Sequence, residues 1–180
     1  MFSWFRRRPH ERAGFRLYGR AVAAARRPVL FATLGIPDTR AGRFEAVCLF
    51  VALLIRRCRQ DPDPRGPALA QAVFDAMFSD MDRTLRELGV GDLSVGRKNR
   101  ELWEAFHGRA AAYEAALDAG DDALLAAALA RNVWRGEAPG GAAGRLAAIA
   151  RAAAAALSAE PIERLLAGEA DFPAPEPLAA

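Results

Sequence analysis

Apolar side chains recur every three or four residues through most of this chain, and the strict alternation of a half-buried strand is nearly absent. An apolar stripe with a period of about 3.6 residues is typical of an amphipathic helix. Because this pattern extends along most of the chain, it predicts an all-α fold. We expect a single compact multi-helix bundle with short flexible termini.

Glycine and proline residues divide the periodic pattern into segments, because both residues interrupt helices. Ser94 is the expected N-cap of the fifth segment. The breaker-rich sequence DPDPRGP at 61–67 is typical of a linker, and EAPGG at 137–141 of a loop. Helices are predicted over residues 15–26, 29–34, 42–59, 68–88, 95–117 and 121–134, then an alanine-rich helix ending near 157 and a short one at 162–166.

The chain of 180 residues is long enough for one core, because a domain of about 150 residues buries roughly two-thirds of its unfolded surface. We therefore expect one helical domain over residues 13–168. A basic segment at residues 1–12 precedes it. A proline-rich flexible tail, EADFPAPEPLAA at residues 169–180, follows it.

One apolar stripe, within residues 68–88, allows two interpretations. Phe74, Met77, Phe78 and Met81 follow one another at helical spacing. Methionine beside aromatic residues suits a groove that accepts varied apolar helices. Packing in the protein's own core explains the same spacing.

Basic charge is concentrated at the N-terminus. Residues 1–27 contain eight arginines and one glutamate, a net +7; because the whole chain carries +3, the remainder carries −4. A basic end of this kind can meet phosphate or anionic lipid head groups. A solvated terminus and a mitochondrial presequence are the other interpretations of residues 1–9. The candidates for contact with a membrane or a ribosome are Trp4, Arg6, Arg7 and Arg8.

Two cysteines and the longest apolar run bear on the location of the protein. Cys48 and Cys58 would lie about 15 Å apart on one helix, which is too far for a disulfide. A reducing compartment is the easier interpretation. The longest apolar run, 46–55, has ten residues, whereas a membrane-spanning helix needs about 20. We expect a cytoplasmic protein with optional peripheral contact on the inner membrane, or a mitochondrial matrix protein if the source is eukaryotic.

Residues 85–109, LRELGVGDLSVGRKNRELWEAFHGR, place glycines beside basic residues, as phosphate-binding loops do. Gly91 and Gly96 have the spacing of G-x-x-x-x-G-K-[ST]. However, Arg97 occupies the lysine position and Lys98 the hydroxyl position. The motif also needs a preceding strand, and residues 85–88 are predicted to be helical. These departures exclude a nucleotide site of this type.

Metal and catalytic patterns are incomplete as well. Glu104 and His107 form one Glu-x-x-His step, whereas di-iron bundles need two. The second histidine of the sequence, His10, has no glutamate three residues before it. His107 is therefore interpreted as a surface or packing histidine. Without a nucleophile paired with a base, or a set of metal ligands, we expect no enzyme activity and no cofactor.

Two blocks of the sequence resemble the ubiquinol–cytochrome c chaperone family, the assembly factors of respiratory complex III. The resemblance covers about residues 15–135, and the order and spacing of the motifs agree. Phe50 is a departure, because a histidine commonly follows the leucine at position 49 in the family pattern. The first block comprises Leu17-Tyr18-Gly19 and GIPDTRAGRFE at 35–45; the second comprises FSDMDRTLRELGVGDLSVGRK at 78–98 and AFHGRAAAY at 105–113, extended by Asn132 in ALARNVW.

The resemblance implies a compact α-helical, non-catalytic chaperone that helps newly made cytochrome b toward assembly. The implied partners are cytochrome b or its nascent chain, a second assembly factor and the ribosome. The single-domain length and the arginine and alanine bias are similar to those of alphaproteobacterial members. The alternative is a peripheral membrane- or RNA-binding helical adaptor that acts through the arginine-rich N-terminus.

Turns within the two blocks supply the candidate site residues. The predicted turn residues are Gly35, Gly42, Gly89, Gly91 and Gly96, with a positive φ expected at Gly91. Polar residues gathered at turns between helices suit a protein-binding surface. Helix capping and turn formation alone would explain several of them equally well. The candidate partner-binding residues are Asp38, Thr39, Arg43, Glu45, Asp92, Arg97, Lys98, Arg109 and Tyr113.

Overall fold

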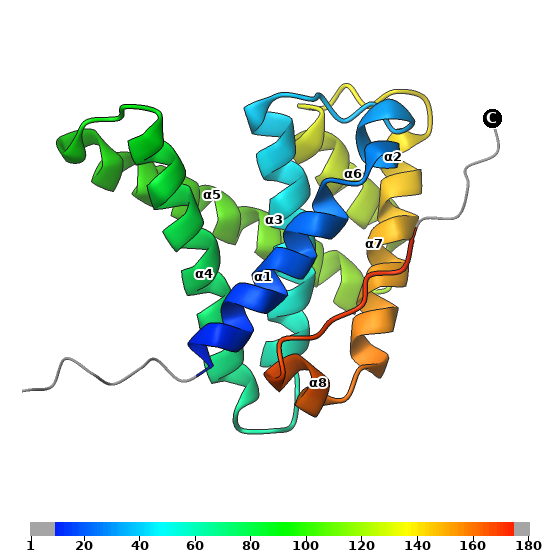
Figure 1. The fold of residues 1–180 in the computed structure, drawn as a ribbon. Helices are drawn as coiled ribbons and strands as arrows, with labels where there is room; N and C mark the ends of the chain where they lie inside the picture. The colour runs from blue at the N-terminus through cyan, green and yellow to red at the C-terminus, as the bar shows by residue number, and fades with distance from the viewer. Residues whose placement is uncertain (1–9, 175–180) are drawn as a thin grey trace, which may run out of the picture.

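The computed structural model of the chain describes residues 10–174, apart from the side chains of residues 92 and 93. This part of the chain contains eight α-helices and no strand (Figure 1). The all-α prediction is confirmed, and each predicted helix is present. The helices are α1 (Glu11–Ala25), α2 (Pro28–Ala32), α3 (Arg40–Arg59), α4 (Gly66–Glu87), α5 (Asp92–Asp118), α6 (Asp122–Val133), α7 (Ala142–Ala159) and α8 (Ile162–Leu166).

Two helices begin three or more residues earlier than predicted. α1 begins at Glu11 rather than at 15, and α5 begins at Asp92 rather than at 95. The N-cap of α5 is Gly91, and the Ser94 N–H donates to the Gly91 carbonyl at 2.8 Å. The predicted cap at Ser94 is therefore wrong. The apolar period, which guided the prediction, starts only after the polar first turn of α5.

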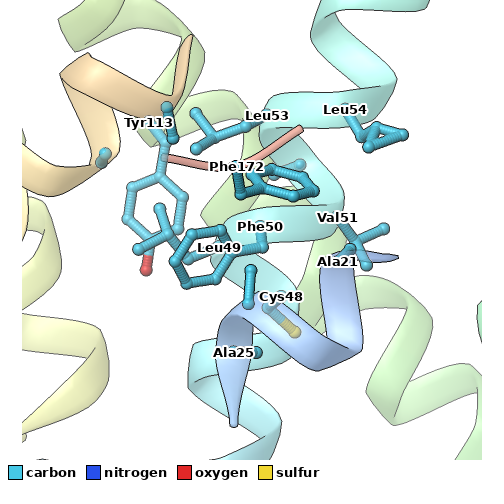
Figure 2. Packing of buried hydrophobic residues seen from close by; sticks show 14 of the residues in the cluster. Ala21, Ala25, Cys48, Leu49, Phe50, Val51, Leu53, Leu54, Tyr113 and Phe172 are labelled. Atoms are coloured by element: carbon cyan, nitrogen blue, oxygen red, sulfur yellow. The ribbon is translucent and has the colours of Figure 1, made fainter. Parts of the chain in front are cut away.

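α3 lies at the centre of the bundle and packs against α1, α4, α5 and α7 (Figure 1). Every side chain from Cys48 to Leu54 is buried, so this part of the helix has no polar face. A helix that is apolar on all sides is stable only inside a core. Ala21 and Ala25 of α1 lie in the same cluster of buried side chains (Figure 2).

A glycine allows α1 to approach α4 closely. A Cβ added at Gly14 would lie 2.5 Å from the carbonyl carbon and from the carbonyl oxygen of Ala72. Real Cβ atoms do not come this close to backbone atoms, so a larger residue would push the two helices apart. The close approach buries Gly14 and Ala13 against α4.

The C-terminal segment after α8 belongs to the core as far as Phe172, which differs from the predicted flexible tail at 169–180. The Phe172 ring meets the Phe50 ring edge to face, with centroids 5.4 Å apart and an interplanar angle of 88° (Figure 2). Ala170 is buried as well. Arg27 donates hydrogen bonds to the carbonyl oxygens of Phe172, at 2.5 Å, and of Pro173. Prolines prevent a helix here, but they do not prevent packing.

α7 has the length and composition of a membrane-spanning helix, although no such stretch was predicted. Its 18 residues have a mean hydropathy of 1.2, and 39% of them are buried inside the bundle. The prediction counted uninterrupted apolar residues, whereas Gly144, Arg145 and Arg151 interrupt the alanines of α7. α7 packs against α3 and α6, and a core helix passes the same test of length and composition.

Cys48 and Cys58 form no disulfide, as predicted, and both side chains are buried. Burial raises the pKa of the Cys58 thiol to about 12. Burial also raises the pKa of the Cys48 thiol well above its ordinary value. Both thiols therefore stay protonated at neutral pH and pack as small apolar side chains.

Replacing Gly14 with alanine should destabilise the fold by about 1–3 kcal/mol, because the added Cβ would overlap the backbone of Ala72. Gly19→Ala is the matched control on the same helix, since no atom lies within 4 Å of its Cβ position. Urea unfolding should give a lower midpoint for Gly14→Ala. The Gly19→Ala midpoint should be unchanged or higher, because alanine favours the helix by up to about 1 kcal/mol. Equal midpoints for the two variants would contradict this account of the α1–α4 contact.

Replacing Phe172 with alanine should cost about 3–5 kcal/mol of unfolding free energy, as is typical when a core aromatic side chain is removed. Thermal melts should show the loss. The comparison is a chain that ends at residue 174, which keeps Phe172 and should melt like the full chain. A native melting temperature for Phe172→Ala would show that the segment adds nothing to the core.

Candidate partner-binding pocket

The predicted partner-binding residues fall into two separate groups. Six of them lie on the loop before α3, on α3 itself and on the middle of α5, whereas Arg97 and Lys98 lie near the turn between α4 and α5. Figure 1 shows this turn apart from the N-terminal end of α3. The nine residues therefore do not share one face. The side chain of Asp92, and all of Trp4, Arg6, Arg7 and Arg8, lie outside the described residues.

The loop between α2 and α3 shapes the start of α3. Gly35 has a left-handed φ of 68°, which glycine adopts without a steric penalty. Thr39 is the N-cap of α3, and its hydroxyl accepts a hydrogen bond from the Gly42 N–H at 3.2 Å. The Asp38 carboxylate accepts a hydrogen bond from Arg43 Nε at 2.6 Å, and this bond lowers the pKa of Asp38. The loop is thus fixed to the helix by its own polar residues.

Gly42 lies in the first turn of α3 and not in a turn between helices, which corrects the prediction for this residue. A Cβ at this position would lie 2.0 Å from the carbonyl oxygen of Pro37. Glycine is needed here because the preceding loop folds back over the first turn of the helix. The first block of family-like sequence thus ends in a compact loop–helix unit.

Glu45 and Arg109 form an ion pair that joins α3 to α5. Arg109 Nε donates to Glu45 Oε2 at 2.5 Å, and Nη2 donates to Oε1 at 2.6 Å. A third bond runs from Arg109 Nη1 to the Ala105 carbonyl at 2.8 Å. Glu45 is 7% exposed, and its hydrogen bonds raise the pKa of Arg109. Removing either partner would leave the other charge unpaired at a largely buried position.

Two further hydrogen bonds fasten the end of α6 to this region. Asn132 Nδ2 donates to the hydroxyl oxygen of Tyr113 on α5 at 3.2 Å. Trp134 Nε1 donates to the Gly35 carbonyl at 2.9 Å. Tyr113 is buried in the cluster drawn in Figure 2, and burial raises the pKa of its hydroxyl. Residues far apart in the sequence thus meet at one place.

An open pocket of about 690 Å³ lies among these groups. We call it the interhelix pocket; it is bordered by the loop before α3, the first turns of α3, the middle of α5, and the end of α6 with the loop that follows. Of the predicted partner-binding residues, Thr39, Glu45 and Arg109 line it. Asn132, which extends the family-like blocks, lines it as well.

The interhelix pocket also contains residues that sequence reasoning missed, namely Arg131, Trp134 and Arg135. Arg131 and Arg135 are exposed, and neither has a hydrogen-bond or ion-pair partner among residues 10–174. Arg135 has a positive φ of 55°, which costs a residue with a Cβ about 1–2 kcal/mol. In a chain with this many arginines, no sequence signal separated these two from the rest. The pocket therefore has two uncompensated guanidinium groups at its edge.

The turn between α4 and α5 differs in detail from the prediction. Gly89 has the positive φ, 74°, whereas Gly91 has a φ of −61°, so the expectation for Gly91 is wrong. Gly96 lies inside α5 rather than in a turn. Arg97 is exposed and lies 3.9 Å from Glu101, a separation that contributes little in water. The sequence has several glycines in this short stretch, and it does not indicate at which of them the chain reverses direction.

A second, more apolar pocket of about 480 Å³ lies between α3, α4 and α5. Its lining includes Phe74, Trp103 and His107, and the His107 ring stacks on the Trp103 ring at a centroid distance of 4.0 Å. His107 thus packs with aromatic rings, in agreement with its interpretation from the sequence. Met77 of the same stripe is fully buried, while Phe74 borders the pocket. Among the described residues, no group of three or more His, Cys, Asp and Glu is arranged to hold a metal.

Comparison with known proteins adds an independent observation. The sequence profile of the ubiquinol–cytochrome C chaperone family matches residues 32–172, a range that contains the whole interhelix pocket. The crystal structure of the Cbp3 homolog from Brucella abortus is similar, with a TM-score of 0.82 and 37% sequence identity. That similarity covers 92% of this chain and 91% of the other. No curated protein sequence matches the chain. On the match to the family profile and the close structural similarity together, the chain belongs to the ubiquinol–cytochrome c chaperone family.

Proposed function

We propose that the chain is a non-catalytic assembly chaperone for ubiquinol–cytochrome c reductase, respiratory complex III. It binds newly made cytochrome b, or an assembly partner of it, at the interhelix pocket. The observation that carries the proposal is the meeting of separate family-like blocks around one open pocket. Residues 35–45, 105–113 and 132 come from three regions of the chain, and polar contacts hold them together.

The location of these contacts supports a binding role. Glu45 and Arg109 satisfy each other, so they give the pocket a fixed wall rather than a free charge. Arg131 and Arg135 remain available at the edge, where Glu137 is the nearby acidic residue of the lining. A charged hydrogen bond from arginine to carboxylate is among the stronger polar contacts. The segment that docks here should therefore carry carboxylate groups.

The alternative function is a peripheral membrane- or RNA-binding adaptor that acts through the basic N-terminus. It would use Arg6, Arg7 and Arg8, which lie outside the described residues, and the exposed arginines of α1. The two functions differ in their consequences, because an adaptor of this kind need not affect complex III. We propose a cytoplasmic location with peripheral contact at the inner membrane, near the site of cytochrome b insertion.

Deleting the gene should lower the amount of assembled complex III and of spectroscopically detected b-type cytochrome. The physical reason is that an apolar client without its chaperone aggregates or is degraded before assembly. Cytoplasmic enzyme levels should stay unchanged, and the native gene in trans should restore the complex. Normal cytochrome b levels in the deletion strain would overturn the proposed function.

Replacing Arg131 and Arg135 together with glutamine should weaken capture of the assembly partner by about tenfold or more, because two charged contacts are lost. The melting temperature should change little, since both side chains are exposed and unpaired within residues 10–174. Quantitative pull-down from solubilised membranes measures capture. Arg97→Gln, on the α4–α5 turn, is the matched control that removes an exposed arginine elsewhere.

Arg109→Gln serves as a contrast, because it strands the buried Glu45 and should cost about 3–5 kcal/mol of stability. Arg109→Gln should therefore lose capture of the assembly partner together with a melting temperature below that of the native protein. If Arg97→Gln reduced capture and the Arg131 and Arg135 variant did not, the partner would bind at the α4–α5 turn instead of at the interhelix pocket.

A further inference from the structure

We propose that the outer side of α1 is a docking face for an anionic phospholipid surface. The face, here called the basic face, consists of Arg12, Arg16 and Arg20 of α1 and of Arg26, which follows the helix directly. The inference concerns where the protein meets the membrane. It is independent of which partner occupies the interhelix pocket.

The position of α1 turns these arginines outward. Arg12, Arg16 and Arg20 are spaced by four residues, so they lie on one side of the helix at successive turns. The opposite side is buried and includes Leu17, Ala21 and Ala24. α1 crosses the outside of the bundle in Figure 1, and all four arginines of the basic face are exposed. The helix therefore presents a row of charge on a convex surface.

The charge of the basic face is largely uncompensated. Arg12, Arg20 and Arg26 have no hydrogen-bond or ion-pair partner among residues 10–174, and Arg16 donates only a long bond of 3.4 Å to the Ala167 carbonyl. Glu11 is the one acidic residue of α1. Acidic side chains on the neighbouring elements have other partners: Asp75 accepts from Gln71, Asp80 accepts from Tyr18 and pairs with Arg83, and Glu169 and Asp171 pair with Arg164.

The shape and the apolar content of this side of α1 suit a membrane surface. Gly19 and Ala23 are exposed between the arginines, so no bulky side chain keeps a flat surface away. Phe15, which is 47% exposed, stands at the edge of the face and can enter the head-group boundary. Arg12 and Arg16 also border a shallow pocket of about 190 Å³ against Leu166, large enough for one lipid phosphate group.

A lipid surface fits these observations better than RNA does. RNA-binding surfaces commonly track the strand in a basic groove with aromatic platforms, whereas the basic face is one convex helix. The sequence that precedes α1 also contains basic and aromatic residues, namely Trp4, Arg6, Arg7 and Arg8. A basic cluster with interspersed aromatic residues at the start of a basic amphipathic helix is typical of a membrane-surface segment.

Co-sedimentation with vesicles tests the proposal in the full-length protein. The probes are vesicles of phosphatidylcholine alone and vesicles of equal parts phosphatidylcholine and phosphatidylglycerol. The test variant replaces Arg12, Arg20 and Arg26 with glutamine. The matched control replaces Arg40, Arg83 and Arg100, which are also exposed and lie on α3, α4 and α5, and so removes the same charge elsewhere.

The native protein should bind only the vesicles with phosphatidylglycerol, and rising salt should release it. The test variant should lose affinity by about 100-fold, because each of the three replaced arginines contributes about fivefold at an anionic surface. The control should stay within about twofold of the native affinity. The test variant should still capture the assembly partner, which separates this proposal from the proposed function.

Three outcomes would overturn the proposal. The first is equal vesicle binding by the test variant and the control. The second is release of the protein from vesicles by inorganic phosphate but not by chloride at the same ionic strength. This result would indicate a site for free phosphate. In the third, the native protein binds polyuridylate RNA but neither kind of vesicle, and the test variant no longer binds the RNA. This result would make the basic face an RNA-binding surface.

Discussion

The burial of α3 on all sides determines where the other helices can lie, because a helix without a polar face is stable only when neighbours cover each side. α1, α4, α5 and α7 supply that cover, and Phe172 of the C-terminal segment adds an edge-to-face contact with Phe50. The positions of α1 and of the C-terminal segment are therefore consequences of the composition of α3. Both of the proposed surfaces depend on this central helix. The interhelix pocket lies at the N-terminal end of α3, and the basic face lies on α1, which packs across α3.

The Glu45–Arg109 pair places a polar joint at the edge of this apolar core. Burying two charges is costly, and a well-packed apolar pair of similar volume is often at least as stable. The bidentate geometry does, however, fix the rotation of α5 relative to α3, because each guanidinium nitrogen in the pair meets its own carboxylate oxygen. Where the interhelix pocket must keep one shape, a fixed orientation of α5 relative to α3 matters more than a higher free energy of unfolding. We infer that the pair serves the shape of the interhelix pocket.

Local patterns predicted the helices because periodicity and helix breakers act over a few residues. α8 is found at the predicted residues 162–166, bracketed by Pro161 and by Gly168 with its φ of 80°. Contacts over long distances in the sequence were not predictable in the same way. Glu45 and Arg109 are 64 residues apart, and each could be named as a candidate only from its block, without its partner. The sequence places Phe172 in the predicted tail because its proline-rich surroundings exclude a helix, and composition does not reveal where a single aromatic ring will pack. Gly89 and Gly91 are both plausible reversal points, so the choice between them depends on how α4 and α5 meet.

The contact between Phe50 and Phe172 also bears on the order in which the chain can fold during synthesis. A ribosome makes the chain from its N-terminus, so α1 and α3 emerge long before the segment that covers them. Until residues 170–173 leave the exit tunnel, Phe50 lacks its aromatic partner and Arg27 lacks the carbonyl groups of Phe172 and Pro173. Completion of the core is thereby tied to the synthesis of residues 170–173. A chain that stops before Phe172 would leave Phe50 of α3 without this cover, and exposed apolar surface of that kind is what cellular proteases and chaperones recognise.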